Sequence, residues 1–506
     1  MVVILDFGDA GSQVIGRKVR ELGIYCEVLP GNTTAAQIKS KRPEALILSG
    51  SNSSVYESGA PGLDIDLDGF KIPILGICYG SQLMAALSGG TVAAMPEPEN
   101  GLIPIRVIHD SPLFRGIERD TDCRMSHSDM ITQIPAGFTV TAVTDNCPVA
   151  AMEDRSRDLY AVQFHPETGE SGCGKEILEN FLFEIAGLSA DWDINGYVDR
   201  TVEELREKIG DKRALCALSG GVDSMVSAMM VHRAVGQQLT CIFVDTGLMR
   251  LNEGDSVEAI CKSRFGMNFI RINAQERFLQ KLAGVTDPEQ KRKIIGEEFI
   301  RVFEEESQKL GKIEYLVQGT IYPDIIESGV ASGVIKSHHN VGGLPEIIDF
   351  EEILEPVRML FKGEVRRAGI HLDIDEEIVW RQPFPGPGLA VRCIGELKKE
   401  RLDTLRLADA IFREEITNAG FDREIEQYFA VLTDVKSVGA VRDTRTYGYT
   451  VALRAIKTTD FMTAEIARLP YELIERCVAR ITSEVEDINR VVYDVTSKPP
   501  GTIEWE

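Results

Sequence analysis

The chain is organised around the stretch Leu218-Ser219-Gly220-Gly221-Val222-Asp223-Ser224. It follows a short apolar run, residues 214–217, which is typical of a buried strand. It precedes residues 225–231, whose apolar positions have helical spacing. Two glycines allow the backbone to turn tightly and to approach a ligand closely. The free N–H groups of such a turn, and of the helix start that follows it, point at one spot where the helix dipole also favours an anion.

This turn has two interpretations. A Gly-Gly pair between a strand and a helix is about as often a simple turn as it is a phosphate-binding loop. No Gly-Lys-Ser/Thr follows, so the loop is not the common nucleotide loop with a lysine for the γ-phosphate. The hydroxyls of Ser219 and Ser224 favour phosphate binding. The run Ser-Gly-Gly-Val-Asp-Ser resembles the pyrophosphatase loop of enzymes that split ATP between its α- and β-phosphates and replace a carbonyl oxygen with nitrogen.

Length and charge limit what the chain can do. It has 506 residues, which is typical of about three domains. Lys and Arg number 55 against 79 Asp and Glu, so the formal net charge is -24. A surface this acidic repels nucleic acid and anionic membranes, and we expect neither as a partner. An enzyme for phosphorylated substrates must then concentrate its positive groups where the anions bind.

Cysteine usage and hydropathy favour a soluble protein of a reducing compartment. The 10 cysteines are scattered and form no Cys-x-x-Cys motif, so neither a disulfide scaffold nor a structural zinc site is expected. The first residues lack the pattern of a signal peptide, and no apolar run is long enough to span a bilayer. We therefore predict a cytoplasmic location.

Residues 1–190 alternate apolar strands with amphipathic helices. Strands are expected at residues 2–6, 26–29 and 45–48, and helices at 12–22 and 35–40. This alternation predicts a mostly parallel sheet that is covered on both faces. In such sheets ligands bind beyond the carboxyl ends of the strands.

Residues 72–84 carry the sequence Ile-Pro-Ile-Leu-Gly-Ile-Cys-Tyr-Gly-Ser-Gln-Leu-Met. A strand that runs through Gly-x-Cys-x-Gly into a helix has the form of a nucleophile elbow, with Cys78 where a hydrolase carries serine. The N–H of Tyr79 and the helix N-terminus face the same point, which favours a thiolate and an oxyanion. The alternative is a buried structural cysteine beside a glycine turn.

A partner for Cys78 appears in residues 161–167, Ala-Val-Gln-Phe-His-Pro-Glu. The apolar strand delivers His165, and Glu167 follows two residues later, where it can orient the imidazole. Cys78, His165 and Glu167 then form a catalytic triad assembled from separate strand ends. A lone histidine is more often structural, but the elbow and Phe-His-Pro-Glu together are much more specific.

These motifs resemble the class I glutamine amidotransferase domain, over residues 1–188. The resemblance implies that Cys78 attacks the side-chain amide of glutamine and that His165 protonates the departing ammonia. It places the oxyanion hole at Gly50 and Tyr79. The chain departs from the family pattern at Ser51-Asn52, at residues 9–11 and 168–172, and at Ser128. These departures leave the triad intact and concern glutamine affinity and the way in which the glutaminase is switched on.

Residues 191–381 continue the alternation around the Ser219–Ser224 loop. Asp245 ends an apolar strand at residues 239–245 and could reach a ribose hydroxyl, although an acidic residue that caps a turn is equally common. The basic run at 291–293 is either a solvated charge run or a phosphate site. The Gly-rich residues 335–345 form either a surface connection or an active-site lid. Their two adjacent histidines lack convincing metal spacing.

The Ser219–Ser224 loop, residues 284–296 and residues 335–346 together resemble the family of glutamine-hydrolysing GMP synthases, and the similarity runs through the whole chain. It implies XMP, ATP and glutamine as substrates, with release of AMP and diphosphate. It implies that XMP contacts Arg292 and Lys336. It also implies an ATP and Mg²⁺ site, with Asp223 as the metal ligand, made of Ser219, Gly220, Gly221, Val222, Asp223, Ser224 and Asp245.

Residues 382–388, Gln-Pro-Phe-Pro-Gly-Pro-Gly, exclude a helix and mark a rigid turn into a third domain, residues 382–506. Its helices and strands predict a small α/β unit that resembles the C-terminal dimerisation domain of the family. A terminal tail is ordinarily frayed. The resemblance instead places Lys498 and Glu504 at the XMP site, so this tail must be docked.

The predicted fold class is α/β. It consists of two doubly wound parallel-sheet domains, residues 1–190 and 191–381, and a C-terminal domain, residues 382–506, through which the chain forms a homodimer. Two alternatives are an ammonium-preferring synthase with a weak glutaminase and a nucleotide- or glutamine-sensing homologue. Asparagine synthetase is disfavoured because its nucleophile is an N-terminal cysteine, whereas this chain begins Met1-Val2. An NAD synthetase would use a different glutaminase fold.

Overall fold

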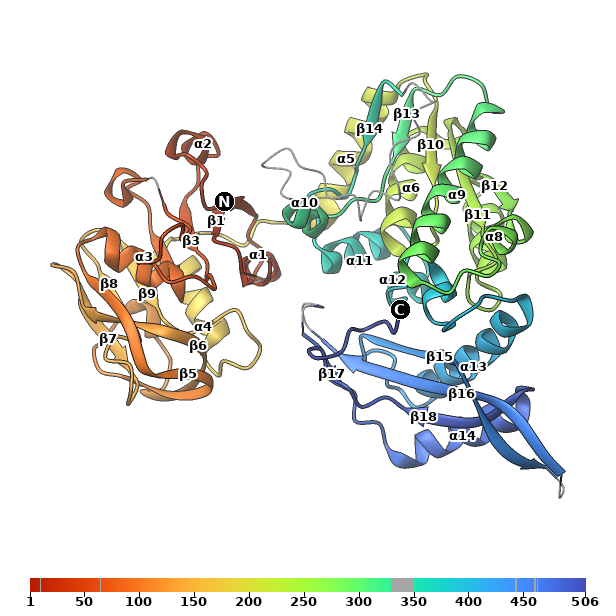
Figure 1. The fold of residues 1–506 in the computed structure, drawn as a ribbon. Coiled ribbons are helices and arrows are strands. Elements are labelled where there is room, and N and C mark those ends of the chain that lie inside the picture. The colour runs from red at the N-terminus through yellow and green to blue at the C-terminus, as the bar shows by residue number, and fades with distance from the viewer. Residues whose placement is uncertain (10, 64, 329–349, 442–443, 459–460, 462) are drawn as a thin grey trace. The chain divides into compact units, whose positions relative to one another are not determined.

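The computed structural model describes residues 1–9, 11–63, 65–328, 350–441, 444–458, 461 and 463–506 (Figure 1). Within these residues the chain forms two compact units. The first comprises Met1–Asp193 with residues 326–328, and the second comprises Ile194–Ile325 with residues 350–506. The finer division of the second unit at residue 381 stays a prediction. The predicted lid at residues 335–345, with Lys336, lies outside the described residues.

A nine-stranded sheet forms the first unit, in the order β2-β1-β3-β4-β9-β8-β7-β5-β6 (Figure 1). The strands from β2 to β9 in this order are parallel, and the remaining pairings are antiparallel. The strands are β1 Val2–Asp6, β2 Cys26–Pro30, β3 Ala45–Leu48, β4 Ile74–Ile77, β5 Thr91–Val107, β6 Asp120–Gln133, β7 Thr139–Val143, β8 Ala151–Asp154 and β9 Leu159–Val162. The helices are α1 Gly11–Glu21, α2 Ala35–Ser40, α3 Tyr79–Leu87 and α4 Gly174–Glu179.

The inner parallel strands β3, β4 and β9 are buried at every position because both of their faces are covered. On one face Val3 and Leu5 of β1 share a core with Leu83 of α3. The alternate residues Val2 and Ile4 are also fully buried. The predicted parallel α/β sheet is therefore confirmed. The antiparallel extension was not predicted; its long strands β5 and β6 alternate buried with exposed residues, as strands with one solvated face do.

The sheet of the second unit has five parallel strands in the order β12-β11-β10-β13-β14. The direction of the winding reverses between β10 and β13, which creates a crevice at the carboxyl ends of these two strands. The strands are β10 Ala214–Ala217, β11 Leu239–Asp245, β12 Asn268–Asn273, β13 Tyr315–Val317 and β14 Glu352–Leu354. The helices are α5 Ile194–Ile209, α6 Val222–Val235, α7 Glu253–Glu258, α8 Gln275–Lys281, α9 Pro288–Gln308, α10 Tyr322–Ser328, α11 Lys362–His371 and α12 Glu376–Val379.

Residues 317–324 join a strand to a helix: β13 ends at Val317, and α10 begins at Tyr322. Pro323 is the second residue of this helix. The first turn of a helix tolerates proline because the N–H groups there have no partner within the helix.

The C-terminal part of the second unit contains a four-stranded sheet and two helices. The elements are α13 Lys399–Asn418, β15 Gln427–Val441, β16 Thr444–Lys457, β17 Glu465–Ile466, α14 Tyr471–Glu484 and β18 Ile488–Tyr493. One hydrophobic core runs without a break from Leu215 of β10 and Ile242 of β11 to Phe412 of α13 and Leu432 of β15. This shared core explains why residues on both sides of 381 belong to one compact unit.

Two buried basic side chains hold the end of the chain. Arg392 is fully buried, and its Nε and Nη2 donate to the two carboxylate oxygens of Glu504 at 2.9 and 2.7 Å. Its guanidinium lies 3.9 Å from the centre of the Phe429 ring. Lys291 is also fully buried; it donates to two main-chain carbonyls at 3.0 and 3.3 Å and pairs with Glu506. The tail is therefore docked.

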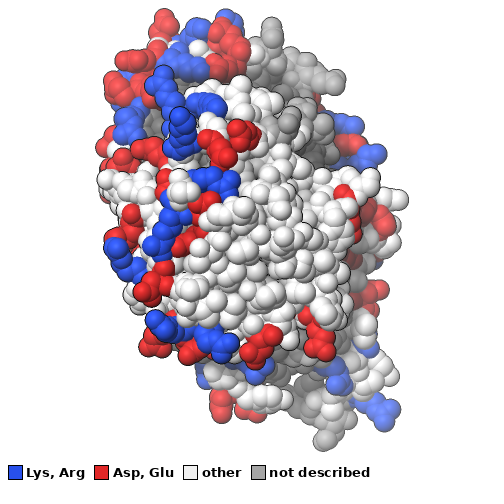
Figure 2. All heavy atoms as spheres, turned by 90° about the vertical axis from the view of Figure 1, so that its left-hand side faces the viewer, with Lys and Arg blue, Asp and Glu red and all other residues white. Residues whose placement is uncertain are grey.

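Charged side chains cover the surface unevenly. Figure 2 shows one face on which side chains of both signs lie along the margins of a wide area that carries neither. On this face of a chain whose net charge is -24, the charged side chains are thus distributed unevenly. Among the helices in the described part of the chain, none combines the length and the apolar character that a membrane crossing requires.

We expect Arg392→Ala to destabilise the second unit by about 3 kcal/mol and to release the tail, because it leaves the largely buried Glu504 carboxylate without its partner. Denaturant unfolding measures the first effect, and limited digestion with carboxypeptidase measures the second. Arg423→Ala is the matched control, since Arg423 is exposed and its carboxylate partners Glu376 and Asp422 are at least partly exposed. It should change the stability by less than about 1 kcal/mol. Equal losses in the two variants would contradict the docking role.

Candidate functional site

Cys78 lies on a strained turn between β4 and α3. Its φ is 53° and its ψ is -110°, a backbone conformation that residues with a side chain rarely adopt. The turn is possible because the flanking glycines lack side chains. A Cβ on Gly80 would lie 2.3 Å from the carbonyl oxygen of Leu48, and one on Gly76 would lie 2.7 Å from that of Gly80. These close contacts with backbone atoms therefore require glycine two positions before and two positions after Cys78.

The Cys78 side chain opens on a pocket of about 260 Å³. Its sulfur lies 3.7 Å from the amide nitrogen of Gln163 and 3.8 Å from the carbonyl oxygen of Ser126. Tyr79 begins α3, so its N–H has no acceptor within the helix. The pocket is lined by Ser51, Asn52, Ser53, Ser54, Cys78, Tyr79, Gln82, Pro98, Glu99, Asn100, Ser126, His127, Ser128 and Asp129. Three positions that depart from the family pattern thus line the same pocket as the cysteine.

The structure brings the three predicted triad residues together. His165 Nδ1 and Glu167 Oε1 are 2.8 Å apart, and the Glu167 side chain is buried. The Cys78 sulfur lies close enough to His165 for its charge to act on the imidazole. Burial by itself lowers the pKa of His165. The charges of Glu167 and Cys78 raise this pKa by more than burial lowers it, so the pKa lies well above its ordinary value. The site therefore favours a protonated imidazole next to the sulfur.

A further carboxylate, that of Asp9, lies against the triad, and the sequence did not identify it. Its Oδ2 lies 2.1 Å from the position of a Cβ on Gly50, and His165 Cε1 lies 3.6 Å from the same position. Two main-chain N–H groups at the start of α1 donate to its Oδ1 at 3.0 and 3.3 Å. Burial, together with the nearby charge of Glu167, raises the pKa of Asp9 to about 6. The predicted oxyanion residue Gly50 thus has a carboxylate beside it.

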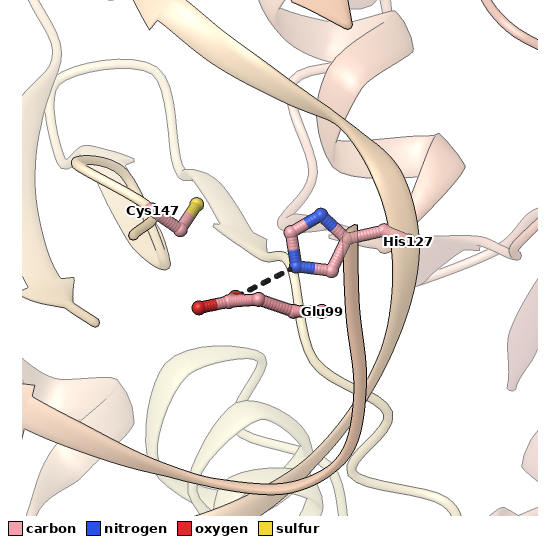
Figure 3. A group of neighbouring side chains, drawn as sticks. All are labelled: Glu99, His127 and Cys147. Carbon is pink, nitrogen blue, oxygen red and sulfur yellow. Dashed lines mark hydrogen bonds and ion pairs between the residues drawn. The ribbon is translucent and has the colours of Figure 1, made fainter. Parts of the chain in front are cut away.

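Three buried side chains converge beside this pocket, and Glu99 and His127 among them line it (Figure 3). The ligand atoms of Glu99, His127 and Cys147 lie within 4.8 Å of one another, a spacing that a metal ion could use. Protein groups already bond all three, since the Cys147 thiol donates to the carbonyl of Val149 at 3.4 Å. His127 Nε2 lies 3.1 Å from Glu99, its Nδ1 lies 2.8 Å from the Asp129 carbonyl oxygen, and Thr144 donates to Glu99 at 2.6 Å. The cluster thus stabilises the pocket wall by its own hydrogen bonds.

The Ser219–Ser224 loop lies at the crevice of the second sheet, between the end of β10 and the first turn of α6. Gly220 has a φ of +80°, which favours glycine. The hydroxyl oxygens of Ser219 and Ser224 are 2.9 Å apart. A Cβ on Gly319, just after β13, would lie 2.8 Å from the main-chain nitrogen of Ser224. The loop is therefore a compact turn that presents the N-terminus of a 14-residue helix.

Three basic side chains near this loop were missed by sequence reasoning. Lys362 Nζ donates to Asp223 Oδ2 at 2.6 Å, and Arg381 Nη1 donates to the Gly220 carbonyl at 3.1 Å. Arg366 lies close enough to Asp223 for its charge to raise the Arg366 pKa, although burial lowers this pKa by more. These residues come more than 130 positions after the loop and are spread over 20 residues, so no local sequence pattern connects them with the loop.

The Asp223 carboxylate is the candidate ligand for Mg²⁺. Its Oδ2 accepts a hydrogen bond from Lys362, whereas its Oδ1 is buried and has no hydrogen-bond partner among the described residues. An unpartnered buried carboxylate oxygen is costly, and a negatively charged oxygen is the donor that Mg²⁺ prefers. The residues present therefore fit a magnesium ion.

Asp245 lies at the end of β11 and is engaged by protein groups. Its Oδ2 accepts hydrogen bonds from Arg271 at 2.6 Å and from Gln275 at 3.1 Å. The side chain is almost fully buried. A contact with a ribose hydroxyl stays a prediction.

The residues predicted to contact XMP have different surroundings. Arg292 pairs with Glu289 and donates to the main-chain oxygen of Glu506 at 2.6 Å. Glu504 pairs with Arg392 and lines a cavity of about 450 Å³ beside the tail. Lys498 donates to the carbonyl oxygen of Phe461 at 2.6 Å, and Lys336 lies outside the described residues. Arg292 thus contacts the docked tail, and Glu504 is part of that tail.

The basic run at 291–293 does not form one patch. Lys291 is fully buried, whereas Lys293 is exposed and lies 4.0 Å from Glu297. All three residues belong to α9, where successive side chains point in directions about 100° apart. The helix thus separates charges that are adjacent in the sequence.

Comparisons with known proteins identify the chain. The family described as "Glutamine amidotransferase class-I" matches residues 3–185, and the family described as "GMP synthase C terminal domain" matches residues 414–505. The fold and the cysteine site of the first unit thus define a class I glutamine amidotransferase. Proteins named "GMP synthase [glutamine-hydrolyzing]" from Acetivibrio thermocellus, Ruminiclostridium cellulolyticum and Clostridium tetani are 58%, 57% and 54% identical, over 100% of this chain and 99% of each relative.

The chain therefore belongs to the family of glutamine-hydrolysing GMP synthases, and it is a ligase of GMP biosynthesis. The predicted family and function are confirmed. The comparisons do not support the two alternatives, an ammonium-preferring synthase and a sensing homologue.

We expect Asp9→Asn to stabilise the first unit at pH 8, and about half as much at pH 5. The folded protein holds the Asp9 proton more tightly than the unfolded chain does, because the pKa rises from 3.8 to about 6. Stability is thus lost as the pH rises from about 4 to about 6, and the full cost above that range is about 3 kcal/mol. Denaturant midpoints of the wild type and the variant at both pH values measure it.

Asp145→Asn is the matched control for this prediction, since Asp145 is an exposed residue of the same unit. It should shift the midpoint little at either pH. An equal gain from Asp9→Asn at pH 5 and pH 8 would contradict the assignment of a buried, titrating carboxylate.

Proposed function

We propose that this chain converts XMP, ATP and glutamine to GMP, AMP, diphosphate and glutamate. The observation that carries the proposal is the combination, in one chain, of the Cys78–His165–Glu167 geometry with a phosphate-type loop at the crevice of a doubly wound sheet. The first site frees ammonia from glutamine. The second activates the oxygen that ammonia replaces.

In the first unit, the Cys78 sulfur attacks the side-chain amide carbon of glutamine. The N–H groups of Gly50 and Tyr79 stabilise the oxyanion that forms. The raised pKa of His165 keeps a proton ready for the leaving ammonia, and Glu167 holds the imidazole in place. Water then attacks the thioester, with His165 as the base, and glutamate leaves.

In the second unit, the C2 oxygen of XMP attacks the α-phosphorus of ATP, and diphosphate leaves. The Ser219–Ser224 loop and Lys362 hold the phosphates, and Asp245 lies toward the ribose. A magnesium ion on Asp223 would neutralise charge on the departing diphosphate. Ammonia then attacks C2 of the adenylated XMP, and AMP leaves. The residues that we propose for binding XMP are Arg292, Lys336, Lys498 and Glu504.

We also propose that the chain consists of three domains, residues 1–190, 191–381 and 382–506, and forms a homodimer through the last. Exposed apolar side chains on β15 and β16 support the dimer; Val435, Val438 and Tyr447 are 63%, 53% and 68% exposed. The net charge of -24 opposes nucleic acid or membrane partners. The 10 cysteines are all free, which fits a cytoplasmic location.

A direct assay tests the proposed reaction. The chain is incubated with XMP, ATP, Mg²⁺ and glutamine, and the formation of GMP, AMP and diphosphate is followed. Omission of any one substrate should stop GMP formation, and ADP should not appear. Formation of ADP in place of AMP would contradict cleavage between the α- and β-phosphates.

We expect Cys78→Ala to lower glutamine-dependent GMP formation by about 10³-fold or more, because it removes the nucleophile. Synthesis from added ammonium should continue, since the second site is intact. GMP formation with each nitrogen source measures both. Cys26→Ala is the matched control, because Cys26 is a buried cysteine of the same unit that does not line the pocket. It should keep both activities. Loss of both in a folded Cys78→Ala variant would contradict this division of labour.

We expect Lys362→Gln to lower GMP formation from glutamine and from ammonium alike, by about 100-fold, because it removes a positive charge beside the proposed phosphate loop. The same two assays measure this effect. Lys399→Gln is the control, since Lys399 is exposed and, within the described parts of the chain, pairs only with Asp403. A loss confined to the glutamine-dependent reaction would show that Lys362 does not serve the nucleotide site.

A further inference from the structure

Two buried thiols lie side by side in the first unit. Cys123 of β6 and Cys173, which immediately precedes α4, have sulfur atoms 3.3 Å apart. Both side chains are at most 3% exposed. They are 50 positions apart in the sequence, so only the tertiary structure brings them together. The mechanism proposed above uses neither thiol.

The segment from His165 to Cys173 is bonded to the strand that carries Cys123. The N–H of His165 donates to the carbonyl of Arg124 at 2.9 Å. The Ser171 hydroxyl accepts from the N–H of Arg124 at 3.0 Å and donates to the carbonyl of His165 at 2.7 Å. The residue next to Cys123 thus contacts both ends of the segment.

Two further contacts tie this segment to β6. The N–H of Gly172 donates to the carbonyl of Asp122 at 3.0 Å. Glu170 pairs with Arg124 at 3.3 Å. Both sequence neighbours of Cys123 therefore hold the segment that begins at the catalytic imidazole. A movement of Cys173 relative to β6 is transmitted to that imidazole through these bonds.

The two thiols differ in pKa. The hydrogen bond between them raises the pKa of Cys123 and lowers the pKa of Cys173. Cys173 is therefore the sulfur that carries negative charge more readily, and the thiolate is the form that reacts with oxidants. Cys123 lies in position to resolve the oxidised product.

We propose that Cys123 and Cys173 form a reversible disulfide that slows glutamine hydrolysis by displacing the His165 segment. The effect on activity rests on the proposed role of His165. A disulfide requires an S–S distance of about 2.05 Å, so the sulfur atoms must approach by roughly 1.2 Å. A displacement of about 1 Å in an active site can cost about 100-fold in rate. The nucleotide site lies in the other unit and keeps its geometry.

A peroxide is the oxidant. The Cys173 sulfur attacks one oxygen of hydrogen peroxide, the O–O bond breaks, and the leaving hydroxide takes up a proton to become water. The Cys123 sulfur then attacks the Cys173 sulfur, the S–O bond breaks, and a second water leaves with the thiol proton. The two thiols lose two electrons, and one peroxide becomes two waters. A small dithiol restores both thiols by exchange.

Peptide mapping tests the bond itself. The full chain is treated with hydrogen peroxide, the oxidant is removed with catalase, free thiols are alkylated, and the unreduced digest is analysed by mass spectrometry. We expect a Cys123–Cys173 linked peptide in the wild type and in Cys78→Ser. It should be absent from Cys123→Ser and Cys173→Ser. Absence of the linked peptide at peroxide doses that oxidise Cys78 would overturn the proposal.

Activity measurements test the consequence. Glutamine-dependent GMP formation should fall about tenfold or more in the oxidised wild type and recover with dithiothreitol, while ammonium-dependent formation is unchanged. Peroxide also oxidises Cys78, but arsenite reduces sulfenic acids and spares disulfides. The loss in the wild type should therefore resist arsenite, and the loss in Cys123→Ser should not. A linked protein with an unchanged glutamine-dependent rate would overturn the regulatory role. Failure of the untreated enzyme to use glutamine would instead contradict the proposed function.

Discussion

The first site depends on one close backbone approach. The start of α3 meets the end of β3 at Gly80, whose N–H donates to the Ser49 carbonyl at 3.0 Å and where no side chain fits. This contact lets the chain turn through the strained conformation of Cys78 and enter a helix at once. The sulfur then opens on the pocket, and the N–H of Tyr79 stays free. A side chain at position 80 would lift the helix and move both groups together.

A close backbone approach at a glycine also shapes the candidate site of the second unit. Gly319 after β13 lies against the first turn of α6, so two neighbouring strand ends and a helix N-terminus meet at one crevice. Buried backbone N–H groups there favour an anion. In a chain with a net charge of -24, positive groups are scarce, and the structure gathers Lys362, Arg366 and Arg381 near this loop. Local concentration of charge thus compensates for the acidic composition.

The pocket around Cys78 combines the proposed triad with altered surroundings. Ser51 and Ser128 line it, and the Asp9 carboxylate lies beside Gly50. These groups do not replace the proposed nucleophile or its proposed base. They change the polarity and charge that a bound glutamine meets, and Asp9 couples the site to pH because its pKa lies near 6. The segment after His165, which also departs from the family pattern, carries the thiol that contacts Cys123. The departures therefore concern control of the reaction more than its chemistry.

The sequence by itself determined the local elements and the two candidate centres. Residues 35–40, 214–217 and 239–245 form the predicted elements with the predicted bounds, because apolar periodicity and glycine turns act over a few residues. The triad was predictable because parallel strands end at one edge of a sheet. Only the tertiary structure decided the antiparallel extension, the place of Asp9 and the ion pair of Lys362 with Asp223. Lys362 and Asp223 are 139 positions apart, and no local pattern encodes the energy of contacts between such distant groups.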